Sequence, residues 1–137
     1  MAVPARLRNL SSLEYFRVAT DLRARIINLS QSQAVPKSLR SAFSVPMCNA
    51  ARDMVNYLVK ADHCFPNTEE HVQLRKDYYA KAEACVDMLA QDLLVLFDHQ
   101  RKYHITKVKV NSILEILRLC DQETKLLKGV RKNVKLR

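Results

Sequence analysis

Glycine is almost missing from this chain. Its 137 residues include one glycine, four prolines and no tryptophan. Folds built from strands need many more turn glycines, so the composition excludes a β-sandwich or barrel and favours helices. With 48% hydrophobic and 27% charged residues, the chain carries enough apolar side chains to fold. We expect one all-α domain, with disorder only at the ends.

The chain also lacks long apolar runs and paired cysteines, and we expect no secretory signal. The longest apolar run, residues 93–97, is five residues long, far short of the ~20 that span a bilayer. The four cysteines (48, 64, 85 and 120) are widely spaced and include no C-x-x-C pair. We expect them to be reduced, small apolar side chains in a cytoplasmic protein that makes no membrane contact.

Catalytic and metal-binding motifs are absent from the sequence as well. The four histidines are isolated and none belongs to an H-E-x-x-H motif. Glu83 and Asp87 lie one helical turn apart, but the Glu-x-x-His motifs of a di-iron site are missing, so we expect a solvated acidic face. We predict no enzymatic activity, no metal and no cofactor.

What the sequence does contain is helical periodicity. Apolar residues recur at spacings of three and four over four segments, which predict helices at about residues 13–29, 37–62, 67–98 and 106–128. Short connections between long helices predict an antiparallel up-down-up-down four-helix bundle.

Local signals refine these boundaries. Pro46 removes a backbone hydrogen bond, so we expect a kink or a broken start near Ser44. Asn67 and Glu70 form a capping-box pattern, and Gly129 is the expected C-terminal cap. The predicted organisation is an N-terminal arm (1–10), the bundle (11–130) and a basic tail (131–137).

The third and fourth segments carry more apolar residues than one bundle core needs. The surplus comprises Leu74, Leu94, Val95 and Phe97 in the third segment and Val108, Ile116, Leu119 and Leu126 in the fourth. Because a monomer buries one stripe per helix, we expect the chain to form a homo-oligomer.

Charge is sorted along the chain. Residues 1–66 hold nine basic and four acidic side chains, residues 67–100 hold three and seven, and residues 101–137 hold eleven and three. The net charge of +9 predicts a cationic surface that attracts polyanions. The candidate nucleic-acid-binding residues are Arg17, Arg23, Arg25, Lys37, Arg40, Lys107, Lys109, Arg118, Lys125, Lys128, Arg131 and Lys132.

The five tyrosines lie outside any known base-reading module. We expect packing roles for Tyr15, Tyr57, Tyr78 and Tyr79, and leave the role of Tyr103 open because basic and polar residues flank it.

Short motifs resemble a bacterial four-helix-bundle superfamily. They are Leu13-Glu14-Tyr15-Phe16, Val35-Pro36-Lys37 followed by Leu39-Arg40, Ser44-Val45-Pro46 followed by Asn49-Ala50, and Tyr103 before Ile113-Leu114-Glu115-Ile116. The superfamily includes the proteins encoded in intervening sequences of ribosomal RNA genes and Avd, the accessory protein of diversity-generating retroelements. One extra residue separates Pro46 from Asn49, and the chain lacks the tryptophan and glycines that follow the glutamate in Avd-like proteins.

This resemblance implies a homopentameric ring with a basic surface. Avd-like members associate with a reverse transcriptase and with template RNA during mutagenic copying. The chain is thus expected to be a non-enzymatic accessory protein that binds RNA or RNA–DNA hybrid. The alternative is a structural or interaction bundle of the intervening-sequence type, whose charge serves an acidic protein partner or solubility alone.

Overall fold

The chain folds into helices. The computed structural model describes residues 4–137, except for the side chains of residues 6, 7 and 11. Within that part of the chain there is no strand, and the predicted all-α class is confirmed. In chain order the elements are α1 (Ala5–Ser11), α2 (Glu14–Gln31), the 3-10 turn η1 (Lys37–Leu39), the π-helical turn η2 (Arg40–Ser44), α3 (Val45–His63), α4 (Glu69–Tyr103) and α5 (Val110–Lys132).

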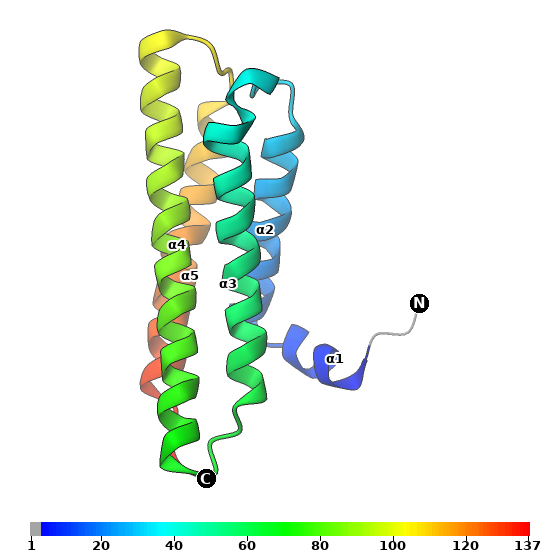
Figure 1. Cartoon of the computed structure of the whole chain (residues 1–137), viewed down its shortest axis with the longest axis vertical. Coiled ribbons are helices and arrows are strands. Elements are labelled where there is room, and N and C mark those ends of the chain that lie inside the picture. Colours follow the sequence, from blue (N-terminus) through cyan, green and yellow to red (C-terminus); the bar gives the residue numbers. More distant parts are fainter. Residues whose placement is uncertain (1–3) are drawn as a thin grey trace.

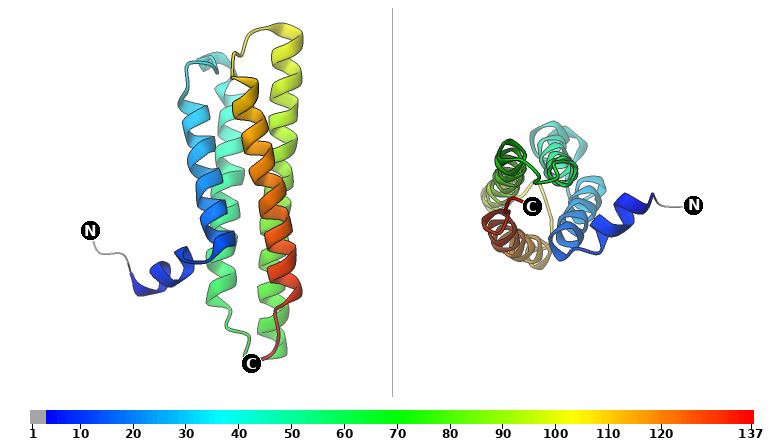
Figure 2. Two further views of the ribbon diagram at one scale, coloured as in Figure 1. Left: turned by 180° about the vertical axis from the view of Figure 1, so that it is seen from behind. Right: turned by 90° about the horizontal axis from the view of Figure 1, so that it is seen from below.

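The four long helices lie side by side as a helical bundle (Figure 1). Helix α2 packs against α3 and α5, and helix α4 also packs against α3 and α5. The α2–α5 seam is therefore opposite the α3–α4 seam, as the end-on view in Figure 2 shows. We call the end with η1, η2 and the α4–α5 connection the upper end; α1 and the C-terminus lie towards the lower end.

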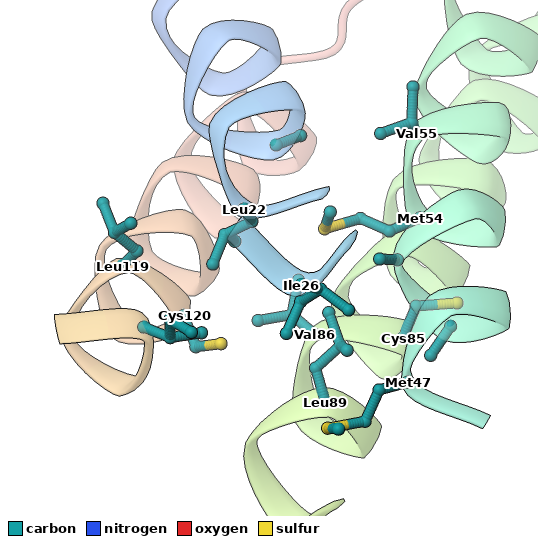
Figure 3. Packing of buried hydrophobic residues seen from close by; sticks show 14 of the residues in the cluster. Leu22, Ile26, Met47, Met54, Val55, Cys85, Val86, Leu89, Leu119 and Cys120 are labelled. Carbon is teal, nitrogen blue, oxygen red and sulfur yellow. The ribbon is translucent and has the colours of Figure 1, made fainter. Parts of the chain in front are cut away.

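One continuous apolar core runs between these helices. Figure 3 shows part of it, with labelled apolar side chains from α2, α3, α4 and α5 gathered between the helices. Each fully buried leucine, isoleucine or methionine side chain contributes roughly 1.5–3 kcal/mol to folding. The largest fully buried side chains are Leu10, Leu22, Ile26, Met47, Met54, Leu58, Tyr79, Leu89, Leu93, Leu96, Ile113 and Leu127.

The cysteines occupy the expected kind of place. Cys85 and Cys120 are buried in the core, Cys48 and Cys64 are half-buried, and all four are free. Burial raises the pKa of the Cys120 thiol to about 12, so this thiol stays protonated and unreactive at neutral pH.

Much of the surplus apolar surface predicted for the last helix is covered within the chain itself. Val108, Ile116 and Leu119 are buried in the core, and Leu126 packs against it. On α4 more of the predicted surplus remains at the surface of the single chain. Leu74, Leu94 and Val95 are exposed, and Phe97 is only partly buried.

The proline signal is confirmed. Helix α3 begins at Val45 with Pro46 in its first turn, where a missing N–H costs no hydrogen bond. The preceding residues wind as η1 and η2 instead of extending the helix back to Lys37.

The expected start of the third long helix is wrong by one residue. Thr68 is the N-cap, and its Oγ1 accepts a hydrogen bond from the backbone N–H of His71 at 3.1 Å. The Asn67 Oδ1 lies 3.0 Å from Nδ1 of the same histidine, so Asn67 acts beside the cap. Asn67 and Thr68 are adjacent and both have side chains that can cap a helix. In the structure it is the Thr68 hydroxyl that accepts the His71 N–H.

The connection before the last helix also differs from the prediction. Residues 99–102 belong to α4, which continues to Tyr103, and α5 begins at Val110, four residues after the expected start. The polar residues of 99–102 are compatible with helix, and the two salt bridges from Arg101 and Lys102 to Asp98 support this last turn.

The chain ends are more structured than expected. In the predicted arm, residues 5–10 are helical and Leu10 is buried, whereas residues 1–3 lie outside the described part. At the other end α5 continues to Lys132, Val134 packs against the core, and the Arg137 N–H donates a 2.8 Å hydrogen bond to the Pro66 carbonyl. The segment 131–137 is therefore part of the packed unit.

Gly129 lies inside α5 and is not its cap. Its φ is not positive, and a Cβ added at this position meets no atom within 4 Å. We expect Gly129→Ala to stabilise the protein by about 0.5–1 kcal/mol, because glycine loses more backbone entropy in a helix than alanine.

Urea unfolding measures this change, and Ala24→Gly at an exposed site of α2 is the matched control, expected to cost a similar amount. A destabilised Gly129→Ala variant would contradict the helical placement of this glycine.

Candidate nucleic-acid interface

The connection between α4 and α5 is an extended segment. Helix α4 ends with His104 in the left-handed conformation (φ 58°), and the His104 N–H bonds the Gln100 carbonyl at 3.0 Å. Burial then alternates, because Thr106 and Val108 point inward while Lys107 and Lys109 are exposed. This period of two is typical of an extended chain and places both lysines on the same side.

Hydrogen bonds at both edges hold the segment in place. The Gln100 side-chain amide donates to the Val108 carbonyl and accepts from the Val108 N–H, both at 2.7 Å. On the other edge, the Lys107 N–H donates to the Ala34 carbonyl at 2.8 Å. The segment is thereby tied to α4 and to the loop after α2.

A cleft of about 460 Å³ opens beside this segment, between α2 and α5. Three cationic side chains line it: Arg25 from α2, and Lys107 and Lys109 from the connection. Its other lining residues are Asn28, Leu29, Ser32, Ala34, Val108, Asn111, Ser112, Glu115 and Ile116.

The start of α5 adds to the positive potential of the cleft. The helix begins beside Lys109, and its first turn has neither a side-chain cap nor an acidic residue. Uncapped N–H groups and the helix dipole both favour an anion at such an end. Together with the lysines, they give this part of the cleft the character of a phosphate-binding surface.

One carboxylate, Glu115, also lines the cleft, and it forms an ion pair with Arg118. Arg118 donates to it through Nη2 and Nε at 2.6 and 3.1 Å, and these bonds, followed by the nearby charges of Arg118 and Arg25, lower the pKa of Glu115. Arg25 itself is 3.2 Å from Asp21. Such exposed pairs are weak, typically below about 1 kcal/mol, so a phosphate can compete for Arg25.

The three arginines of α2 do not form one face. Arg23 and Arg25 are two residues apart, which separates their directions by about 200° around the helix. Arg25 lines the α2–α5 cleft, whereas Arg23 is half-buried and Arg17 is exposed near the lower end. Of the three, the structure brings only Arg25 into the cleft.

The basic residues of the segment after α2 lie at the upper end. Lys37 is exposed in η1, and Arg40 is half-buried in η2, where its Nε has no hydrogen-bond partner among the described residues. They share this end of the bundle with Lys107 and Lys109 (Figure 1), although they do not line the cleft.

The cations in the second half of α5 form a separate group towards the lower end. Helix geometry puts Lys128 roughly 27 Å from the start of α5. Lys125 pairs with Asp121 at 2.9 Å, while Lys128 and Lys132 are exposed and have no ion pair among the described residues. The predicted set is therefore divided between two ends.

Arg131 has a structural role within this group. Its Nε lies 2.7 Å from Oε2 of Glu83, and its Nη2 donates to Oε1 at 3.3 Å. Glu83 is 8% exposed, so the prediction that it belongs to a solvated acidic face is wrong. This pair joins α4 to α5, and removing Arg131 would leave a buried charge unpaired.

Sequence reasoning missed the polar residues that complete the cleft. Asn28, Asn111 and Ser112 carry no charge, and the role of Gln100 depends on a contact with a residue eight positions away. The alternation of β-branched residues with lysines from Thr106 to Val110 was the available signal for an extended segment.

Comparisons with known proteins leave the family open: no family model matches the chain, and no curated protein or solved structure is significantly similar to it. Within residues 4–137, no helix has both the length and the apolar character needed to cross a membrane. In the same range no three histidine, cysteine, aspartate or glutamate side chains come together as a metal would require.

Glu123 is a buried acid on α5, outside the cleft. It is fully buried, and neither of its carboxyl oxygens has a hydrogen-bond partner in the part of the chain that the structure describes. Burial, with a smaller repulsion from Glu14, raises its pKa to about 8. This acid is therefore largely protonated at pH 7, since only the neutral form tolerates such a site.

We expect stability to fall as pH rises from about 5 to 8.5. Between its ordinary pKa and about 8, the unfolded chain has lost the Glu123 proton while the folded chain still binds it, so raising the pH through this window disfavours folding by roughly 3–5 kcal/mol in total. Urea unfolding at pH 5 and 8.5 should show the loss in the native chain and a smaller loss in Glu123→Gln, which cannot ionise. Equal losses in both proteins would contradict the buried-acid account.

Proposed function

We propose that this protein is a non-enzymatic nucleic-acid-binding accessory protein that holds RNA or an RNA–DNA hybrid by its phosphates. The observation that carries the proposal is the convergence of Arg25, Lys107 and Lys109 at the uncapped start of α5. On the resemblance to Avd, its partner is a retroelement reverse transcriptase acting on template RNA during mutagenic copying.

Phosphate contacts suit the chemistry of this cleft. Lysine, arginine and helix N-termini are common phosphate partners and carry no sequence information. Asn28, Asn111 and Ser112 supply neutral hydrogen-bonding groups beside them. The expected binding is strong at low salt and weakly dependent on sequence, because counterion release dominates it.

One observation favours the alternative of a structural or interaction bundle of the intervening-sequence type. Arg25, Arg118 and Lys125 each pair with a carboxylate one helical turn away. In that function the charges stabilise helices and keep the protein soluble, and nucleic acid has no role.

Replacing cleft lysines tests the proposal directly. We expect Lys107→Gln with Lys109→Gln to weaken binding to a 20-base-pair RNA–DNA hybrid and to reduce the slope of log affinity against log salt by about 1.4–1.8, since each phosphate contact adds about 0.7–0.9. Fluorescence anisotropy from 50 to 200 mM salt measures both quantities.

The matched control is Lys125→Gln with Lys128→Gln, which removes the same charge from the other end of α5. This pair should change the slope less. Failure of the native protein to bind at 50 mM salt would refute nucleic-acid binding. Equal effects of the two pairs would show that the cleft is not the phosphate site.

The proposal includes assembly. Four long helices in an antiparallel up-down-up-down order would form the subunit, and a homopentameric ring is the assembly that the resemblance implies. Exposed apolar side chains support association: Met88, Leu94 and Val95 on α4 are 55, 55 and 52% exposed, and Leu114 on α5 is 56% exposed. Contact between subunits would remove them from water.

Sedimentation velocity at micromolar concentration should show a species several times the 15.8 kDa of one chain. Leu94→Gln with Leu114→Gln should shift it towards smaller species, because polar groups at a contact must lose hydration. Leu136→Gln, which changes an exposed leucine near the C-terminus, is the control and should leave the assembly intact. A native chain that stays monomeric would contradict the ring.

A further inference from the structure

A cluster of two tyrosines and two lysines lies on the α3–α4 seam. Each helix contributes one tyrosine and the lysine three positions later: Tyr57 with Lys60 from α3, and Tyr78 with Lys81 from α4. Residues three apart share a helix face. The two rings stack across the seam, with centroids 6.2 Å apart and planes inclined by 26°.

The lysines lie over these rings. The Lys60 Nζ is 5.4 Å from the Tyr57 centroid, and the Lys81 Nζ is 5.8 Å from the Tyr57 centroid and 5.5 Å from that of Tyr78. Neither lysine forms an ion pair with a carboxylate in the described part of the chain, unlike Arg25, Arg118 and Lys125. Their positive charge is therefore available to a further anion.

The cluster differs from the other tyrosine pair of the protein. Tyr15 and Tyr79 are buried in the core, with their hydroxyls 3.2 Å apart and their rings edge to face. Tyr57 and Tyr78 are only half-buried, and the lysines beside them are exposed. The first pair fits the packing role expected from the sequence, whereas the second pair keeps ring surface and charge accessible.

Stacked aromatic rings with adjacent cations match the chemistry of single-stranded nucleic acid. Every base offers a flat face that stacks on tyrosine, and the phosphates between bases pair with lysine. Bases in a duplex are already stacked on each other, so only unpaired nucleotides can use such rings. An acidic protein segment would use the lysines but would not require the rings.

We infer that the cluster of Tyr57, Lys60, Tyr78 and Lys81 binds unpaired nucleotides, with a base stacked on the exposed ring surface and phosphates on the lysines. The inference rests on the proposed nucleic-acid function and adds a second contact to it. Because the α3–α4 seam is opposite the α2–α5 cleft, one subunit would contact nucleic acid on two sides (Figure 2).

The test compares an unstructured 12-nucleotide RNA with a 20-base-pair hybrid. The main variant is Tyr57→Leu with Tyr78→Leu, which keeps apolar packing on the seam but removes the rings. Affinity for the single strand should fall by roughly tenfold or more with an unchanged salt slope, since stacking is not electrostatic. Affinity for the hybrid should stay the same.

The second variant, Lys60→Gln with Lys81→Gln, keeps the rings and removes the charge. It should lower the single-strand salt slope by about 1.4, the value for two phosphate contacts. Tyr103→Leu is the matched control: this ring is 62% exposed at the upper end of α4, outside the cluster. It should leave single-strand affinity unchanged.

A direct signal comes from 2-aminopurine placed in the single strand, because its fluorescence drops when the base stacks. The drop should occur with the native protein and with Tyr103→Leu, and disappear with the double tyrosine variant. If the hybrid binds but the tyrosine variant keeps both the drop and its single-strand affinity, the cluster is not the site and the proposed function stands. If only the lysine variant loses affinity for the single strand, the cluster binds anionic groups without base stacking. That result would overturn the inference.

Discussion

The two hydrogen bonds between the Gln100 side chain and the backbone of Val108 determine what the upper end of the molecule can do. They hold the α4–α5 connection extended against α4, while the Lys107 N–H ties it to Ala34 after α2. Together with the burial of Thr106 and Val108, these bonds keep Lys107 and Lys109 on one side of the chain. The part of the cleft that Lys107, Val108 and Lys109 line is therefore positioned by this clamp.

A high net charge alone does not identify a binding surface. Several cations predicted to meet phosphate are paired within their own helices, and Arg131 is committed to the buried Glu83. What distinguishes the α2–α5 cleft is convergence, because residues far apart in sequence bring their charge to an uncapped helix start. On the opposite seam, Lys60 and Lys81 lie near tyrosine rings, and their charges are available because no carboxylate of residues 4–137 pairs with them.

The helical fold could be predicted because long stripes at spacings of three and four admit little else, and Pro46 correctly indicated where α3 begins. The connection at 104–109 could not be predicted from those stripes, since Val108 and Val110 also fit a continuing helical pattern. The charge bias indicated Arg25, Lys107 and Lys109, but their meeting depends on how α2 and α5 pack. The sequence indicated a surface position for Glu83, because its partner Arg131 is 48 residues away.

The central claim is that nucleic-acid phosphates lie in the α2–α5 cleft. Ultraviolet cross-linking of bound RNA, followed by mass spectrometry of the peptides, locates the contact on the native protein without any substitution. The account predicts cross-links in peptides containing Asn28 and residues 107–112. Cross-links confined to residues 125–137, at the other end of α5, would contradict it.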